Sequence, residues 1–132
     1  MKILKTLLPI AIVLLMVMSV SAQDKGLMVK KIVIAESVAE REPVNVDTVF
    51  SADIGKVFCH TVIVNGDTSR TITHLWKYEG EAVAEVGLEI KKSSKWRTWT
   101  SKTINKKQTG KWQVKVLNEN GDVLATKCFT IK

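Results

Sequence analysis

The chain has 132 residues, of which 45% are hydrophobic and 25% charged, and it carries a formal net charge of +7. This composition is too apolar for a disordered tail, and the length suits one hydrophobic core rather than two. The chain is also too short for most enzyme folds that are built on large sheets.

Residues 1–22 are predicted to be an export signal. Lys2 and Lys5 precede the apolar run Leu7–Val20, and Val20-Ser21-Ala22 offers the small residues that a signal peptidase reads. The run is shorter than the roughly 20 residues of a membrane span, which disfavours the alternative of an uncleaved anchor. We therefore expect one mature domain, residues 23–132, that is periplasmic or secreted and has no further membrane span.

The mature part is rich in residues that favour strands. Valine, isoleucine and threonine supply 33 of its 110 residues, against 5 leucines, and branching at Cβ suits a pleated sheet. Val86, Leu88 and Ile90 alternate with polar or small residues, which is typical of a half-buried strand. In chain order, strands are predicted near 29–38, 44–50, 56–64, 70–79, 82–90, 95–104, 111–118 and 122–131.

Turn signals separate these runs at short intervals. Asn65-Gly66-Asp67, Glu79-Gly80, Thr109-Gly110 and Asn120-Gly121 each lie between two predicted strands. Asn120-Gly121 suits a type I′ hairpin turn, because both residues tolerate a positive φ. Seven to eight short antiparallel strands predict an all-β, immunoglobulin-like β-sandwich, and a small β-barrel is the alternative.

Charge is unevenly distributed along the mature chain. Residues 23–90 have a formal charge of −4, and residues 91–132 have +9. Lysine on edge strands discourages aggregation, which is one explanation of the basic half. The other is a functional basic face formed by Lys91, Lys92, Lys95, Arg97, Lys106 and Lys107. Nucleic acid is a poor candidate partner, since an exported chain seldom meets it, whereas envelope anions are available.

Several motifs, taken in order, resemble a known family. They are Arg41-Glu42-Pro43-Val44, Thr61, His74-Leu75-Trp76, Gly80, Trp96-Arg97-Thr98-Trp99-Thr100-Ser101-Lys102, Thr109-Gly110-Lys111-Trp112, Gly121-Asp122-Val123-Leu124-Ala125 and Phe129. Together they resemble the bacterial family described as domain of unknown function 2914, from about Val33 to Ile131. The resemblance implies an exported or membrane-tethered all-β accessory domain without an established activity.

The two cysteines, Cys59 and Cys128, form a candidate disulfide, because paired cysteines of exported domains usually oxidise. Free buried thiols are the alternative. A metal site is not expected, since neighbours such as Cys59 and His60 on a strand point to opposite faces and cannot chelate together.

Two aromatic groups are candidate binding surfaces. His74, Trp76 and Tyr78 share one strand face, which is either core or an exposed platform for a ligand. Trp96 and Trp99 are three apart, so they face opposite ways. If Trp96 is inside, the outer face presents Lys95, Arg97, Trp99 and Ser101. An indole beside arginine suits sugars or carboxylates, although both tryptophans packing inside is the alternative.

Catalytic arrangements are not evident. No Ser–His–acid pattern, phosphate loop or paired carboxylates stand out, so we expect a non-enzymatic protein without a cofactor. The first functional hypothesis is a protein-binding accessory of the bacterial cell envelope, using strand edges and the basic half. The second is a module that recognises anionic glycans through Trp99 with Arg97, or through Trp76 with Tyr78.

Overall fold

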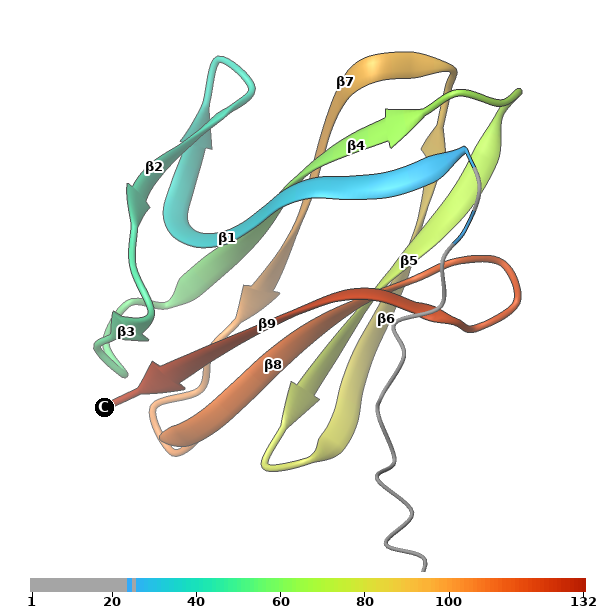
Figure 1. Ribbon diagram of the computed structural model, residues 1–132. Helices are drawn as coiled ribbons and strands as arrows, with labels where there is room; N and C mark the ends of the chain where they lie inside the picture. The colour runs from blue at the N-terminus through green and yellow to red at the C-terminus, as the bar shows by residue number, and fades with distance from the viewer. Residues whose placement is uncertain (1–23, 25) are drawn as a thin grey trace, which may run out of the picture.

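A computed structural model describes residues 24 and 26–132, so the predicted export signal, residues 1–22, lies outside the described residues. Nine strands form two sheets that face each other (Figure 1). The prediction of a β-sandwich is confirmed, and the barrel alternative is wrong, because the described strands remain in two separate sheets. None of the described residues forms a helix that is long and apolar enough to cross a membrane.

The first sheet, sheet A, has four antiparallel strands in the order β2-β1-β4-β7. Its central strand β4 is buried over most of its length, as the sequence VFCHTVIV suggests. Strand β1 bends strongly, so that its C-terminal part and β2 rise away from the rest of the sheet (Figure 1). The strands are β1 (Leu27–Ala39), β2 (Glu42–Val46), β4 (Lys56–Asn65) and β7 (Ser93–Thr103).

The second sheet, sheet B, has five strands in the order β3-β9-β8-β5-β6. Strand β3 runs parallel to β9, and the other neighbours are antiparallel. The strands are β3 (Val49–Phe50), β5 (Arg70–Tyr78), β6 (Glu81–Ile90), β8 (Gly110–Leu117) and β9 (Val123–Ile131).

The strand order is that of an immunoglobulin-like sandwich. Strands β1, β4 and β7 take the positions of A, B and E, and they face β6, β5, β8 and β9 in the positions of C′, C, F and G. Strands β7 and β6 are therefore edge strands of their sheets, each with one neighbour.

One predicted strand, 44–50, is wrong as a single element. The structure divides it into β2 in sheet A and β3 in sheet B, which raises the count to nine. Asp47 causes the break, because its Oδ1 accepts hydrogen bonds from the backbone N–H groups of Thr48 (2.6 Å) and Val49 (3.3 Å). These two hydrogen bonds form an Asx turn, and the chain bends at Thr48 between the two strands.

The hairpin turns also differ from the expectation. Only Gly121 of Asn120-Gly121 has a positive φ, so the predicted type I′ turn is wrong there; the side chain of Asn118 organises this loop instead. Two hairpins have two-residue turns with a positive φ at both positions. One is the predicted turn Glu79-Gly80 (48° and 84°), between β5 and β6, and the other is Glu40-Arg41 (51° and 66°), between β1 and β2. Neither Glu40 nor Arg41 is of the type that favours this conformation.

The core lies between the sheets and is filled mainly by aromatic and β-branched side chains. Trp76, Trp112 and Phe129 form its aromatic centre, with ring centroids 5.8 Å apart for Trp112 and Phe129 and 6.2 Å for Trp76 and Phe129. Both indoles are fully buried. Strand β8 contributes Trp112, Val114 and Val116, which are all buried and alternate with more exposed residues.

Candidate binding site

The outer face of sheet A carries the side chains predicted as a binding patch. In the register of β4 and β7, His60 lies opposite Trp99 and Val62 opposite Arg97. Thr100 points into the sandwich, where its hydroxyl contacts the buried side chains of His74 and Trp76, so the alternation of the strand turns Trp99 and Arg97 to the other face. The outer face of β7 therefore presents Lys95, Arg97, Trp99 and Ser101, while Trp96 packs against the core.

His60 is only 1% exposed although it lies on this outer face. The turn between β1 and β2 covers it: its Nε2 lies 2.8 Å from the carbonyl oxygen of Arg41 and donates a hydrogen bond to it. The imidazole is also parallel to the indole of Trp99, with centroids 5.9 Å apart and an interplanar angle of 7°. Among the described residues, Nδ1 of His60 is the buried side-chain nitrogen or oxygen without a hydrogen-bond partner.

A second contact holds the same turn. Nη1 of Arg97 donates a hydrogen bond to Oε1 of Glu42, the residue after the turn, and the two charges form an ion pair. This hydrogen bond holds the pKa of Glu42 below its ordinary value, so Glu42 stays ionised near neutral pH. The turn between β1 and β2 is thus held against β4 by the hydrogen bond from His60 and against β7 by an exposed ion pair.

These contacts leave a cleft of about 220 Å³ between the hairpin turn and β7. Arg41 and Lys95 have no ion-pair partner within the described part of the chain, so the cleft has uncompensated positive charge. Cations beside an indole form a surface that suits carboxylates. The lining residues are Arg41, Lys95, Trp96, Arg97 and Trp99.

The other predicted basic residues do not join this cleft. Lys91 and Lys92 precede β7, whereas Lys106 and Lys107 follow it. Strand β7 has 11 residues, so at about 3.3 Å per residue roughly 35 Å of strand, measured along the chain, lies between the two pairs. Lys106 instead lies 3.5 Å from Asp53 in an exposed ion pair. Ser101 is exposed on the face of β7 but lies outside the cleft lining.

The alternative aromatic platform is wrong. His74 and Trp76 are fully buried, since β5 is a central strand whose even-numbered side chains face sheet A. Tyr78 is half-buried, and its hydroxyl donates a hydrogen bond of 2.6 Å to the carbonyl oxygen of Thr109. These side chains therefore belong to the core and to its rim.

A chain of hydrogen bonds connects the two sheets through His74. Nε1 of Trp76 donates to Oγ1 of Thr100 (3.1 Å), and that hydroxyl lies 2.7 Å from Nδ1 of His74. Nε2 of His74 lies 3.2 Å from Oγ1 of Thr61, whose hydroxyl donates to the carbonyl oxygen of Thr98 (3.0 Å). With the proton of a neutral His74 on Nε2, Nε2 donates to Thr61 and Nδ1 accepts from Thr100, so every donor in this chain of hydrogen bonds has one acceptor. Burial, and secondarily the nearby His60, lowers the pKa of His74 to about 4.

The disulfide between Cys59 and Cys128 is absent, and both thiols are free. Cys59 points into the core from sheet A, whereas Cys128 lies on the outer face of sheet B, opposite Gln113. Cys128 is exposed, which also corrects the alternative of two buried thiols. No group of three or more metal-binding side chains occurs within residues 24 and 26–132.

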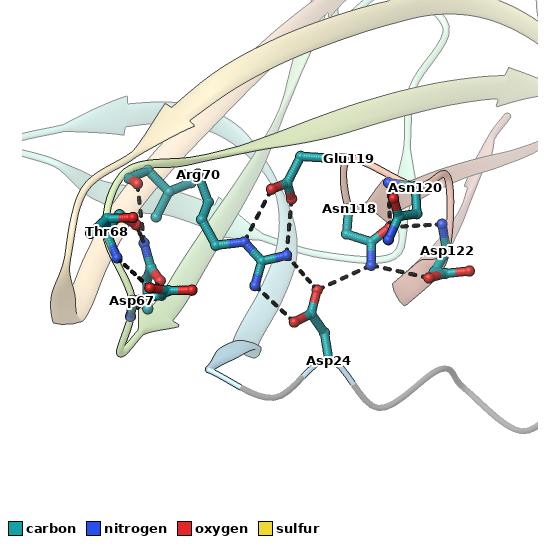
Figure 2. A network of polar contacts seen from close by, with 10 residues as sticks. Asp24, Asp67, Thr68, Arg70, Asn118, Glu119, Asn120 and Asp122 are labelled. Carbon is teal, nitrogen blue, oxygen red and sulfur yellow. Dashed lines mark hydrogen bonds and ion pairs between the residues drawn. The ribbon is translucent and has the colours of Figure 1, made fainter.

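A polar network that the sequence did not reveal joins Asp24 to β5 and to the β8–β9 turn (Figure 2). Arg70 donates two hydrogen bonds to the carboxylate of Asp24, at 2.7 and 2.6 Å, and two to that of Glu119, at 3.1 and 3.0 Å. Nδ2 of Asn118 donates to Asp24 (3.0 Å) and to Asp122 (3.2 Å). The hydrogen bonds from Arg70 hold the pKa values of Asp24 and Glu119 below their ordinary values.

One family model matches the chain, the family described as "Protein of unknown function (DUF2914)", over residues 69–131. The resemblance stated from the motifs is confirmed over this segment, which runs from the start of β5 to the end of β9. The cleft residues on β7 lie within the matched segment, whereas Arg41 and Glu42 precede it. No curated protein matches the sequence.

Solved structures resemble the fold. A mutant β-glucosidase from Listeria innocua in complex with laminaribiose is 9% identical, with a TM-score of 0.50, over 80% of this chain and 16% of that one. A β-glucosidase from Kluyveromyces marxianus (11% identity, TM-score 0.46) and a β-D-glucoside glucohydrolase from Trichoderma reesei (8%, 0.46) are each matched over 80% of this chain. The match covers 14% and 19% of those two chains. The chain thus spans less than a fifth of these proteins, and at such identity the similarity concerns the fold.

Proposed function

We propose that this protein is a non-enzymatic, exported binding domain of the bacterial envelope that holds an acidic partner protein at the cleft between the β1–β2 turn and β7. The observation that carries the proposal is the charge of this cleft. Arg41, Lys95 and Arg97 line it around the indole of Trp99, and only Arg97 has an ion-pair partner among the described residues. The predicted export signal and the resemblance to an accessory-domain family support the location.

The position of the cleft favours a protein as the partner. It lies on β7, an edge strand with one neighbour, so an approaching chain meets both the cations and an accessible strand edge. Its volume of about 220 Å³ is smaller than the ~300–1,000 Å³ of typical small-molecule pockets, and a side chain fits such a space better than a whole ligand does.

A crosslinking pull-down tests the proposal. The tagged mature protein, residues 23–132, is incubated with an envelope extract beside its Lys95→Glu and Arg41→Glu variants. Lys107→Glu is the matched control, because Lys107 is exposed and lies beyond the far end of β7. We expect one dominant acidic partner that both cleft variants lose and the control retains. Equal recovery by all four proteins contradicts the proposal.

The second candidate function is recognition of an anionic glycan. The half-buried indole of Trp99 favours it, because an aromatic ring beside cations suits sugars that carry carboxylates. A Trp99→Phe variant separates it from protein binding. Addition of oligogalacturonate to the wild type is then expected to change the tryptophan emission, and this change should disappear in the variant. Unchanged emission of the wild type contradicts the glycan hypothesis.

A further inference from the structure

The β1–β2 hairpin places one of its own carboxylates on the cleft. Glu42 lies opposite Ala39 at the base of the turn, and its Oε1 accepts a hydrogen bond from Nη1 of Arg97. The side chain of Glu42 is 54% exposed and that of Arg97 is 27% exposed. The carboxylate therefore reaches the guanidinium at the surface, where a carboxylate of another molecule would also approach.

The turn does not depend on this ion pair alone. Glu40 and Arg41 both have a positive φ, which residues with a side chain rarely adopt unless surrounding contacts hold them. The hydrogen bond from His60 to the carbonyl oxygen of Arg41 supplies such a contact, and His60 is 1% exposed. The side chain of Glu42 is thus free to leave Arg97 while the backbone of the turn stays anchored.

We propose that Glu42 is an internal competitor of the ligand, and that the ligand is an acidic peptide segment whose Asp or Glu carboxylate takes its place on Arg97. This inference rests on the proposed function of the cleft. Glu42 is itself a peptide carboxylate bound to Arg97, so it serves as the template for the group that replaces it. Arg41 and Lys95, which have no acidic partner among the described residues, hold further carboxylates of the same segment.

The competition is weak but measurable. Half-exposed ion pairs contribute little free energy, because water and salt screen them. Displacing Glu42 therefore costs the ligand little. Removing its charge is expected to tighten binding by about twofold to fivefold, which corresponds to the usual strength of such pairs.

Fluorescence anisotropy with a fluorescein-labelled hexaglutamate peptide at low ionic strength measures this effect. The mature protein is compared with Glu42→Gln, and with Glu40→Gln as the matched control. Glu40 carries the same charge in the same turn but takes part in no ion pair. Lys95→Glu tests the cleft itself. We expect tighter binding by Glu42→Gln, a smaller change for Glu40→Gln, and at least tenfold weaker binding by Lys95→Glu.

The outcomes separate the two proposals. If the wild type binds and Lys95→Glu does not, but Glu42→Gln and the wild type bind equally, the internal competitor is overturned and the binding site stands. If neither the wild type nor Glu42→Gln binds hexaglutamate, both proposals are overturned. If Glu42→Gln binds oligogalacturonate more tightly than it binds hexaglutamate, the ligand is not an acidic peptide and this part of the proposal is overturned. Equal thermal unfolding midpoints of the wild type and Glu42→Gln show that the fold is intact. If the midpoints differ, Glu42→Asp is measured as well, because its shorter side chain keeps the charge but reaches less far towards Arg97. This variant must then also bind the peptide more tightly than the wild type does.

Discussion

Nδ1 of His74 and the hydroxyl of Thr100 lie 2.7 Å apart in the space between the two sheets. Both side chains are more than nine-tenths buried, and they connect β5 of sheet B to β7 of sheet A. The indole of Trp76 donates to the same hydroxyl. Thr100 thus satisfies two buried polar groups that have no access to water, so a single hydroxyl links the aromatic core to the strand that carries the cleft.

Substituting Thr100 by Val is expected to destabilise the protein by about 2–4 kcal/mol. The volume is nearly unchanged, but Nε1 of Trp76 and Nδ1 of His74 lose their partner in a buried environment. Urea unfolding monitored by tryptophan fluorescence measures the change. Thr71→Val is the matched control: Thr71 is exposed on β5, and its substitution should change the stability by less than about 0.5 kcal/mol. Equal effects of the two substitutions contradict the role of the hydroxyl.

The stability of the fold is expected to decrease as the pH falls from 6.5 towards 4. The pKa of His74 is lowered to about 4 in the folded protein, from an ordinary value of 6.5. The unfolded chain therefore binds a proton in this range before the folded protein does. The contribution of His74 is complete above pH 6.5 and is lost as the pH falls through the interval, by about 3 kcal/mol in total.

Two measurements check this pH dependence. Unfolding free energies at pH 7, 6 and 5 should decrease, and a His74→Gln variant should show a smaller decrease over the same interval. In the wild type, the NMR signal of the His74 ring should not titrate above pH 5. A ring that titrates near pH 6.5 contradicts the burial of a neutral imidazole.

Much of the sandwich is predictable because its strands alternate. A strand with one buried face has a period of two, so the sides on which Arg97, Trp99 and Trp112 lie follow from their spacing. The same rule places His74 and Trp76 on one face. Whether that face is core or surface depends on the position of β5 between β8 and β6, which local pattern does not encode.

The cleft itself was not predictable in full. Lys95, Arg97 and Trp99 come from one strand, and alternation brings them together. Arg41 and Glu42 reach them only because β1 bends and the turn folds over His60, and Glu-Arg is not a sequence that signals a type I′ turn. Contacts of this kind join residues that are about 20 to 55 positions apart, and they depend on tertiary packing.

The link between Asp24 and Arg70 is expected to stabilise the N-terminal end of the domain. Their side chains are 12% and 15% exposed, and Arg70 binds the carboxylate through two nitrogens. Asp24→Asn should lower the unfolding free energy by about 1 kcal/mol, since a neutral amide accepts these bonds less strongly. The measurement is thermal or urea unfolding of the mature protein.

Asp53→Asn is the matched control for this substitution. Asp53 pairs with Lys106 at 3.5 Å, but both side chains are about 80% exposed, so its loss should change stability by only a few tenths of a kcal/mol. A larger effect of Asp53→Asn than of Asp24→Asn would show that the network in Figure 2 does not stabilise the N-terminal end of the domain.

The two cysteines are expected to react at very different rates. Cys59 is fully buried in the core, where burial raises the pKa of its thiol far above the ordinary range and suppresses the reactive thiolate. Cys128 is exposed on the outer face of sheet B, where its Sγ accepts a hydrogen bond of 3.5 Å from Nε2 of Gln113. Iodoacetamide should therefore add one label to the native protein and two in denaturant, as counted by mass spectrometry.

The Cys128→Ser variant should take no label until it unfolds. Two labels added rapidly to the native wild type would place Cys59 outside the core, and absence of labelling until a reductant is added would reveal a bridge between the two thiols.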